Sequence, residues 1–261
     1  MNKNFPLVSI IINCHNGERY LQECINSVLS QSYKNWEIIF WDNKSSDNSK
    51  KILKKFTDQR IKYFFSENFT NLYDARNLAI NKCNGNFVSF LDTDDMWVKN
   101  KLEKQINFIK KNSNYKILYS NYYVLKNNEK QIMYKNELPS GFITQKLLDF
   151  YGIGINTAFL DKSIFDQYNF KKDLNIIGDF DFFIKTSKKF EIGYISDPLT
   201  FYRIHENSFT KKNYKMYINE LSNWIRENEK ILLKNNYSLK KQKFYVKKLK
   251  IKSFLKRFLK F

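Results

Sequence analysis

One stretch decides the fold of this chain: Phe87-Val88-Ser89-Phe90-Leu91-Asp92-Thr93-Asp94-Asp95-Met96-Trp97. Its first five residues have the character of a buried strand, and three carboxylates follow within four positions. Carboxylates this close repel one another, which costs stability unless a cation or several donors compensate. Because Mg²⁺ and Mn²⁺ prefer oxygen ligands, these residues favour a divalent ion bridged to a phosphate-bearing substrate.

A second apolar strand repeats this design earlier in the chain. Residues 36–41 read Trp-Glu-Ile-Ile-Phe-Trp and run into the polar segment Asp42-Asn43-Lys44-Ser45-Ser46-Asp47. In open α/β sheets, ligands bind at the carboxyl ends of the strands. The two acidic strand ends therefore predict one site for a nucleotide and a metal ion.

Both acidic turns also have a purely structural interpretation. Asp and Ser after a strand form turns and cap helices, so Asp94 or Asp95 is a candidate N-cap for a helix at 99–111. A lone acidic turn is more often structural than functional. Three acids in one turn, with Asp42 at another strand end, favour a functional cluster.

The composition indicates one domain with a sizeable core, because 43% of the 261 residues are hydrophobic and 17% are aromatic. Cys14, Cys24 and Cys83 have no paired spacing, so neither a disulfide framework nor a zinc site is predicted. This cysteine usage fits a reducing cytosol. The apolar run 7–12 is too short for a signal peptide and no stretch reaches membrane-spanning length, so we expect a cytoplasmic protein.

The positive charge is concentrated at the C-terminal end. The net charge is +19, and residues 240–261 contain ten Lys or Arg and no acid. Apolar and basic residues alternate there near helical spacing: Ile251, Phe254, Leu255, Phe258 and Phe261, with Lys250, Lys252, Lys256, Arg257 and Lys260 between them. We expect this tail to lie on an anionic membrane surface, as a peripheral contact on the inner face of the cytoplasmic membrane.

Two alternatives compete with this interpretation of the tail. A solvated helix would instead pack its apolar stripe on the protein's own core. Nucleic-acid binding would explain the charge of residues 240–261 but not their apolar stripe, so no nucleic-acid partner is expected.

Strands and helices alternate through the first half of the chain. Apolar runs and helical periodicity predict strand 7–13, helix 18–30, strand 36–41, helix 48–56, strand 61–65, helix 72–83, strand 87–91, helix 99–111 and strand 116–125. Such alternation predicts an α/β fold with a mostly parallel central sheet flanked by helices.

The second half is less regular. Its predicted elements are strand 131–135, helix 144–151, strand 156–160, helix 179–190, strand 192–195, extended segment 200–204 and a long helix 214–233. We find no repeat and no flexible linker. The expected organisation is therefore one domain over 1–212, followed by a C-terminal helical extension over 213–261 that ends in the basic amphipathic tail.

Seven short motifs follow one another in order. They are Val8–Ile12 with Asn16–Leu21, Ser27–Tyr33 with Trp36–Ile39, Asp42–Asp47, Ala75-Arg76-Asn77, Phe90–Asp95, Asp179-Phe180-Asp181, and Tyr202-Arg203-Ile204-His205 with Ser208. Each is weak alone. Together they resemble the family 2 glycosyltransferases, which have a Rossmann-like GT-A fold, over roughly residues 7 to 210.

Three positions depart from that family's pattern. Asn13-Cys14-His15-Asn16 stands where the family commonly has Pro-x-Tyr-Asn, and Asn43 replaces a common second Asp. Gly178 replaces the Glu that usually precedes the acidic residue at 179. This last change affects the acceptor side of the expected site, although Asp179 itself is retained.

The resemblance implies an inverting, metal-dependent glycosyltransferase. Such an enzyme would move a sugar from a nucleotide-diphosphate donor, expected to be a UDP-sugar, to a hydroxyl of a glycan or lipid-linked acceptor in cell-surface polysaccharide or lipo-oligosaccharide synthesis. The nucleotide-binding half would cover about 1–125 and the acceptor-binding half about 126–212. The donor nucleotide would be bound by Asn13, Asn16, Glu18, Asp42, Arg76, Asp92, Thr93 and Asp94.

The matched motifs also imply the reactive groups. A Mn²⁺ or Mg²⁺ ion would be held by Asp94, Asp95 and His205, where it would neutralise the departing diphosphate. Asp179 would be the general base that takes the proton from the acceptor hydroxyl. Arg203 is a further candidate for a diphosphate contact.

Each candidate also has a structural alternative. For Asp42 it is turn capping, and for Arg76 it is a surface ion pair with Asp74 or Glu67. Asp179 is also a candidate helix N-cap, and a lone His such as His205 is more often packed or solvated. We expect Asp181 to be structural.

Two other classes of function compete with sugar transfer. A nucleotidyltransferase would share the α/β sheet and acidic metal ligands, but it would need a Gly-rich phosphate loop, and residues 13–20 hold a single glycine. A basic adaptor without enzymatic activity would bind membranes or nucleic acid and use the acids only in turns. Binding of UDP with Mn²⁺ separates the transferase from the adaptor.

Overall fold

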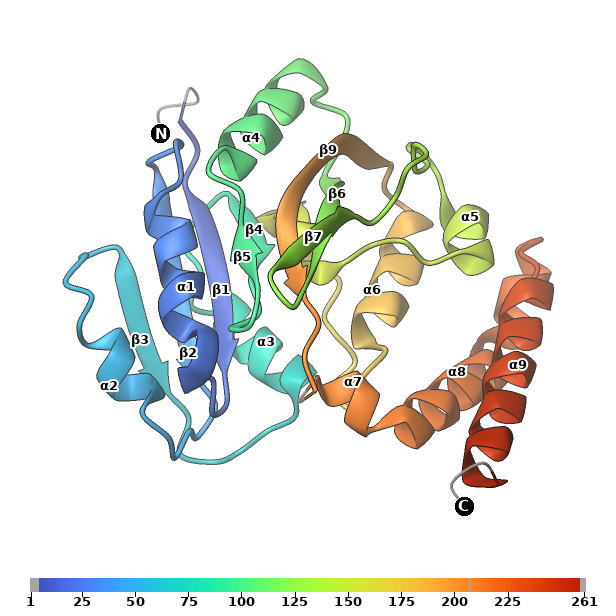
Figure 1. The fold of residues 1–261 in the computed structure, drawn as a ribbon. Helices are drawn as coiled ribbons and strands as arrows, with labels where there is room; N and C mark the ends of the chain where they lie inside the picture. Colours follow the sequence, from blue (N-terminus) through green and yellow to red (C-terminus); the bar gives the residue numbers. More distant parts are fainter. Residues whose placement is uncertain (1–4, 207, 259–261) are drawn as a thin grey trace.

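A central β-sheet organises the molecule, and Figure 1 shows its strands running through the middle of the fold. The computed structural model describes residues 5–206 and 208–258, with side chains to residue 255 at the C-terminal end. The strand order is β3-β2-β1-β4-β8-β6-β9-β5, and β7 pairs with β6. The strands are β1 Val8–Cys14, β2 Trp36–Asp42, β3 Ile61–Phe65, β4 Phe87–Phe90, β5 Met96–Trp97, β6 Ile117–Lys126, β7 Glu129–Ile132, β8 Phe159–Asp161 and β9 Ile192–Arg203.

Helices cover both faces of this sheet (Figure 1). The α-helices are α1 Glu18–Leu29, α2 Ser49–Leu53, α3 Leu72–Ile80, α4 Lys101–Lys111, α5 Thr144–Asp149, α6 Gly178–Ser187, α7 Phe209–Lys212, α8 Tyr214–Lys234 and α9 Lys240–Phe258. Two short 3₁₀ helices, η1 Ile155–Thr157 and η2 Lys162–Asp166, flank β8.

Alternation along the strands sends side chains into two cores. Ile10 and Ile12 of β1 belong to the core under α1, α2 and α4, whereas Ile11 belongs to the core under α3, α5, α6 and α8. All three are at most 1% exposed. Burial on both faces explains why β1 and β2 are nearly continuous apolar runs in the sequence.

The two halves of the sheet differ in strand direction. Strands β3, β2, β1 and β4 are all parallel, with Val8 opposite both Trp36 and Phe87. This confirms the alternation predicted for the first half. In the second half β8 runs antiparallel to β4 and β6, while β9 is parallel to β6. The parallel half therefore ends at one common carboxyl edge, where the acidic turns lie.

Some predicted elements of the second half differ from the structure. The strand predicted at 131–135 exists but is displaced, because β7 covers Glu129–Ile132 and forms a hairpin with β6. Asn127 and Asn128 make its two-residue turn, both with positive φ, the geometry that two-residue hairpins favour. The segments predicted at 192–195 and 200–204 are one strand, β9, whose pairing with β6 is irregular.

The C-terminal helices α8 and α9 lie at the opposite end of the molecule from α2 (Figure 1). Trp224 and Leu232 of α8 join the core shared with α5 and α6, and the Trp224 indole donates to Asp181 Oδ1 at 2.8 Å. The division of the chain at residue 212 stays a prediction. Among the helices that the structure describes, none is long and apolar enough to cross a membrane.

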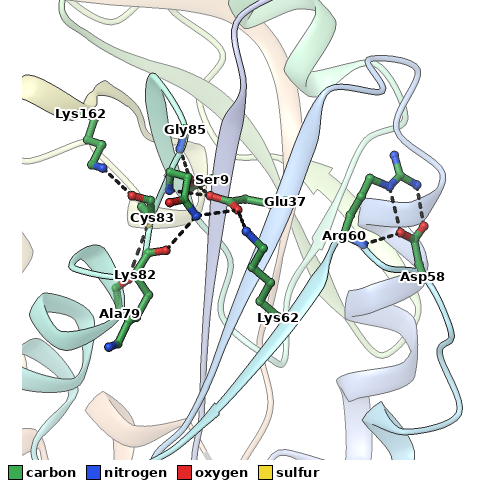
Figure 2. Close-up of polar contacts among 11 residues, drawn as sticks. Ser9, Glu37, Asp58, Arg60, Lys62, Ala79, Lys82, Cys83, Gly85 and Lys162 are labelled. Carbon is green, nitrogen blue, oxygen red and sulfur yellow. Dashed lines mark hydrogen bonds and ion pairs between the residues drawn. The ribbon is translucent and has the colours of Figure 1, made fainter.

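The buried carboxylate of Glu37 ties several strands together near the amino ends of β1 and β2 (Figure 2). Glu37, 3% exposed, accepts hydrogen bonds from Ser9 Oγ at 2.6 Å and from Lys62 Nζ at 2.6 Å. The amide of Asn84 donates to the same carboxylate, and the amide of Gly85 donates to Ser9 Oγ. This network joins β1, β2, β3 and the turn before β4.

Candidate active site

Arg76 and Asp92 form the first recognisable piece of the site. Arg76, on α3, is 2% exposed, and its guanidinium Nη2 lies 2.9 Å from Asp92 Oδ1 just after β4. The rings of Tyr73, Phe90 and Phe170 surround the guanidinium at 5.4–5.9 Å from their centroids. The alternative of a surface ion pair with Asp74 or Glu67 is therefore wrong.

The acidic turn after β4 carries the repulsion that its sequence predicts. Burial raises the pKa of Asp94, and the carboxylate of Asp92 raises it further. Burial likewise raises the pKa of Asp95 well above its ordinary value, with Asp94 and Asp92 adding to the effect. Helix α4 has Asn100 as its N-cap, so neither acid serves as that cap.

Asp95 and Asp94 have different partners. Asp95 is 2% exposed and accepts hydrogen bonds from the Arg203 amide at 2.9 Å and from Asn156 Nδ2 at 2.5 Å. Asp94 Oδ2 lies 2.7 Å from His205 Nε2, and its side chain is 33% exposed. The end of β9 therefore brings His205 to the acidic turn, as the motif order implies.

Asp94 and His205 are the donor groups best placed for a metal ion. Over residues 5–206 and 208–258, no three His, Cys, Asp or Glu groups cluster closely enough to hold an ion by themselves. A carboxylate oxygen beside an imidazole nitrogen nevertheless suits Mn²⁺, and a bound substrate and water would have to supply the remaining ligands. The residues present thus fit a divalent ion that is bound together with its substrate.

The loop after β2 is held by two residues predicted to bind the donor. Asn16 Oδ1 accepts from the amide of Ser46 at 2.8 Å, and Glu18 Oε2 accepts from the amide of Asn48 at 2.9 Å. Asn16 has a φ of 54°, a left-handed conformation that Asn tolerates. Both side chains therefore shape the loop 43–48, and direct contact with a nucleotide stays a prediction.

The Asp42 carboxylate caps the turn that follows β2, which is the structural alternative given for it above. It is 1% exposed, its Oδ1 accepts from the amide of Ser45 at 2.8 Å, and its Oδ2 accepts from the Tyr63 hydroxyl at 2.9 Å. The Asn13 amide, at the end of the neighbouring strand, has buried side-chain atoms without a hydrogen-bond partner in the described part of the chain. This unpaired amide is consistent with a ligand contact there.

Arg203 and Thr93 border the same edge. The Arg203 guanidinium donates to the backbone oxygen of Asp94 and to Glu23 Oε2 at 2.6 Å, and it lies over the Tyr20 ring. Thr93 lies against Gly17, because a Cβ added to Gly17 would come within 2.9 Å of the Thr93 hydroxyl. Because the Arg203 guanidinium already pairs with Glu23, a diphosphate that contacts Arg203 would compete with this ion pair.

Asp179 faces the acidic turn from the other half of the molecule. It lies in the first turn of α6, whose N-cap is Ile177, so Asp179 is not the cap. Its Oδ1 accepts from the Phe180 amide at 2.9 Å and from the Tyr73 hydroxyl at 3.2 Å. Burial raises the pKa of Asp179 above its ordinary value, although Arg76 and both hydrogen bonds act in the opposite direction.

The departure at Gly178 has a packing explanation. A Cβ at this position would lie 2.5 Å from the Tyr73 ring, closer than any real contact. The Tyr73 ring therefore occupies the space that a glutamate at position 178 would need. The Tyr73 hydroxyl also donates to Ile176 O at 2.7 Å, which ties α3 to the start of α6.

A cavity of about 360 Å³ is lined by some of these groups, but Asp94, His205 and Asp42 are not among its lining residues. Arg76, Asp92, Asp95 and Asp179 are all among its lining residues. Sequence reasoning missed Tyr73, Asn156 and Tyr151, which also line the cavity, because no motif marks them. Asp181, by contrast, bonds to Trp224 and Lys185 inside the fold, in agreement with its expected structural role.

The chain is similar in sequence to bacterial glycosyltransferases. The model of the family described as Glycosyl transferase family 2 matches residues 9–170. UDP-Glc:alpha-D-GlcNAc-diphosphoundecaprenol beta-1,3-glucosyltransferase WfgD of Escherichia coli is 40% identical over 164 residues, 63% of this chain and 64% of that relative. The corresponding Escherichia coli glucosyltransferase WfaP is 32% identical over 222 residues, 82% of this chain and 84% of WfaP.

Solved structures agree with the fold. TarS 1-349 of S. aureus, crystallised with UDP, has a TM-score of 0.66 at 22% identity, covering 82% of this chain and 65% of TarS. The mannosyltransferase PcManGT from Pyrobaculum calidifontis, in complex with GDP-Man and Mn²⁺, has a TM-score of 0.64 at 12% identity, over 85% of this chain and 64% of PcManGT. The chain thus spans just under two thirds of WfgD and of both structures. It belongs to glycosyl transferase family 2.

Proposed function

We propose that the protein transfers a sugar from a UDP-sugar to a hydroxyl of a lipid-linked glycan acceptor in the assembly of a bacterial surface polysaccharide. The observation that carries this proposal is the cavity of about 360 Å³ that Arg76, Asp92, Asp95 and Asp179 line together. The activities for which WfgD and WfaP are named, with UDP-Glc as donor and a diphosphoundecaprenol-linked GlcNAc as acceptor, support this donor and acceptor class.

The parallel edge is the proposed donor side. Asp42, Asn13 and Arg76 would contact the nucleotide, because acceptor oxygens suit base and ribose groups and a guanidinium suits phosphate. Asp94 and His205 would hold a Mn²⁺ or Mg²⁺ ion. When bound, this ion would neutralise the negative charge that develops on the departing diphosphate. Asp95 would be a further ligand of this ion, and hydrogen bonds from Asn156 and the Arg203 amide hold its carboxylate in place.

Asp179 is the proposed general base. As the acceptor oxygen attacks the anomeric carbon, Asp179 takes the hydroxyl proton, and the bond between the sugar and the diphosphate breaks on the opposite side. Because the acceptor oxygen attacks the face opposite the departing diphosphate, the anomeric configuration is inverted. Burial raises the pKa of Asp179, which makes its carboxylate a stronger base than an exposed aspartate.

The basic C-terminal helix supports a location at the membrane. We propose that the protein works in the cytoplasm, with α9 against the anionic inner face of the cytoplasmic membrane, where a lipid-linked acceptor would be presented. Residues Ile251 and Leu255 of α9 are 52% and 51% exposed, which leaves apolar surface for such a contact. Phe258 and Phe261, predicted for the same stripe, lie outside the described side chains.

A donor screen tests this function. We would incubate the protein and Mn²⁺ with UDP-, GDP- and dTDP-sugars and follow slow hydrolysis without acceptor. Turnover of a UDP-sugar is expected, and Asp179→Asn is expected to keep UDP binding while lowering transfer by about 10²–10⁴-fold. If no nucleotide sugar binds or turns over, the transferase proposal is wrong and the adaptor class is favoured.

A further inference from the structure

Three side chains from β4, β5 and α4 each donate a hydrogen bond to one backbone carbonyl of the segment 156–158. The pairs are Trp97 Nε1 to Asn156 O at 3.2 Å, Gln105 Nε2 to Thr157 O at 2.9 Å, and Ser89 Oγ to Ala158 O. All residues of this segment are at most 3% exposed. Because buried carbonyls need hydrogen-bond partners, the three side chains form a donor clamp that fixes the segment just before β8.

Lys101, the first residue of α4, links the members of the donor clamp. It is 0% exposed, and its Nζ donates to Ser89 Oγ at 3.0 Å and to Gln105 Oε1 at 2.8 Å. The same nitrogen lies 4.0 Å from the centre of the Trp97 ring. Since Lys101 occupies the amide oxygen of Gln105, the amide nitrogen turns toward the segment 156–158, and the Ser89 hydroxyl likewise donates onward.

The burial of Lys101 is unusual for a lysine. Lysine is almost never fully buried without an acidic partner, and among the residues that the structure describes no carboxylate lies within ion-pair distance of Lys101. Burial lowers the pKa of Lys101 well below its ordinary value. Its two hydrogen bonds need only two N–H groups, which a neutral amine also has. Because burying an amine costs stability, its contacts with the donor clamp are the feature that requires a role.

The clamped segment carries a side chain that reaches the acidic turn after β4. Asn156 Nδ2 donates to Asp95 Oδ2 at 2.5 Å, and the Arg203 amide donates to Asp95 Oδ1 at 2.9 Å. Asn156 and Asp95 both line the cavity of about 360 Å³. A carboxylate that binds a metal ion is oriented by the groups that donate to it, so a fixed Asn156 also fixes Asp95.

We propose that Lys101 is a positioning residue that acts on Asp95 through Asn156. By tying the donor clamp together, Lys101 fixes the segment 156–158. The Asn156 amide then holds the Asp95 carboxylate in the orientation that a substrate-bound divalent ion requires. This inference rests on the proposed function, in which Asp95 is a ligand of that ion.

Hydrogen exchange tests the donor clamp without any ligand. Lys101→Met has a similar length but cannot donate hydrogen bonds. In this variant we expect the amides of Thr157 and Ala158, whose hydrogen bonds close η1, to exchange at least about tenfold faster than in the wild-type protein. Lys111→Met, at an exposed position in the last turn of α4, is the matched control and should exchange as the wild type does. Equal exchange in Lys101→Met and the wild type would overturn the clamp.

Calorimetric titration of UDP with and without Mn²⁺ tests the effect on the metal ion. We expect Lys101→Met to weaken the Mn²⁺-dependent binding about tenfold, as substitutions behind metal ligands do. UDP binding without metal should be unchanged, and Lys111→Met should match the wild type in both titrations. Trp97→Phe keeps an aromatic ring but loses the indole N–H, so it should weaken binding in the same direction. It also keeps the proposal testable if Lys101→Met does not fold, because wild-type affinity in Trp97→Phe would then overturn it.

A double-mutant cycle separates positioning from a general loss of stability. Asn156→Ala should weaken Mn²⁺-dependent UDP binding by about ten- to a hundredfold. Adding Lys101→Met to Asn156→Ala should then weaken it little further, because both residues act on the same carboxylate. A second tenfold loss would overturn the route through Asn156. Equal Mn²⁺-dependent affinity in Lys101→Met and the wild type would refute this inference alone, whereas no UDP binding by the wild-type protein would refute the proposed function itself.

Discussion

At the scale of single residues, the pair of Tyr73 and Gly178 explains how Asp179 is held. The Tyr73 ring fills the space beside Gly178, and its hydroxyl reaches both Ile176 O and Asp179 Oδ1. A glutamate at position 178 would displace this ring. The departure from the family's usual Glu therefore accompanies a contact from α3 that supports Asp179, the proposed base.

Replacing Tyr73 with Phe tests this positioning role. The hydroxyl hydrogen bond lowers the pKa of Asp179, so its removal should raise that pKa further. A general base must be deprotonated, so the acidic limb of the rate profile for transfer should move to higher pH. Tyr33→Phe is the control, because Tyr33 donates to Pro6 O far from the site. An unshifted acidic limb in Tyr73→Phe would show that the hydroxyl does not influence the base.

Local sequence indicates only some of the residues at the candidate site. Asp42 and Asp94 are visible as acids at strand ends, and the sequence therefore predicted them. Tyr73 and Tyr151 are ordinary aromatic residues until the fold brings α3, α6 and the segment after α5 together. Arg76 and Asp92 were each predicted to be functional, but the sequence did not indicate that they pair, because 16 residues separate them.

At the scale of elements, the two edges of the parallel half have separate tasks. The carboxyl edge gathers Asp42 and the turn after β4, while the amino edge is closed by Glu37 and its four donor groups. Burial alone would raise the pKa of Glu37, but the hydrogen bonds from Lys62, Ser9 and Asn84 outweigh it and hold the pKa below its ordinary value. The amino edge is thus a structural anchor for the site.

The Glu37 network makes a pH-dependent prediction. Because the folded protein lowers this pKa, the carboxylate stabilises the fold above its unfolded pKa, and the contribution is lost as pH falls through the folded pKa. Glu37→Gln should lower the free energy of unfolding at pH 7 by about 2–3 kcal/mol, and the deficit should shrink below about pH 4. Urea unfolding from pH 7 to pH 3 measures both. Glu129→Gln, at an exposed position of β7, is the control, and a deficit that is constant with pH would contradict the assignment.

Secondary structure was predicted correctly where the apolar residues of an element repeat with the period of a strand or a helix and are buried. Apolar patterns are clear in strands β1 and β2, which are buried on both faces, and in helices α1 and α4, which each pack one face on the sheet. Strand β5 has two residues and β8 has three, so each exists only through its partners in the sheet. Such short strands depend on tertiary pairing, which local sequence does not encode.

At the scale of the whole molecule, the C-terminal helix combines both interpretations of the tail. Val246 and Leu249, which were not part of the predicted apolar stripe, are 7% and 8% exposed and pack inward, whereas Ile251 and Leu255 of that stripe are half exposed. Exposed lysines flank this outer surface. The inner side of α9 therefore secures it to α5 and α8, and membrane contact by the outer side stays a prediction.

Charge reversal on α9 tests the membrane contact without removing a packed helix. Each lysine near an anionic surface contributes about 1 kcal/mol, so changing Lys247, Lys248 and Lys252 to Glu should weaken binding to phosphatidylglycerol vesicles by at least about a hundredfold. The matched control changes Lys51, Lys54 and Lys55 to Glu, near α2 at the other end of the molecule. Vesicle co-sedimentation at low and high salt measures the effect. Equal weakening in both triple variants would show that net charge, rather than α9, governs binding.

We propose that the acidic turn after β4 binds the donor through a divalent ion. Calorimetric titration of UDP into the wild-type protein and into Asp94→Asn, each with and without Mn²⁺, tests it most directly. We predict that Mn²⁺ strengthens UDP binding by the wild-type protein, and that Asp94→Asn weakens this metal-dependent binding by at least about tenfold. Identical UDP affinity in all four titrations, or no binding in any of them, would contradict the account.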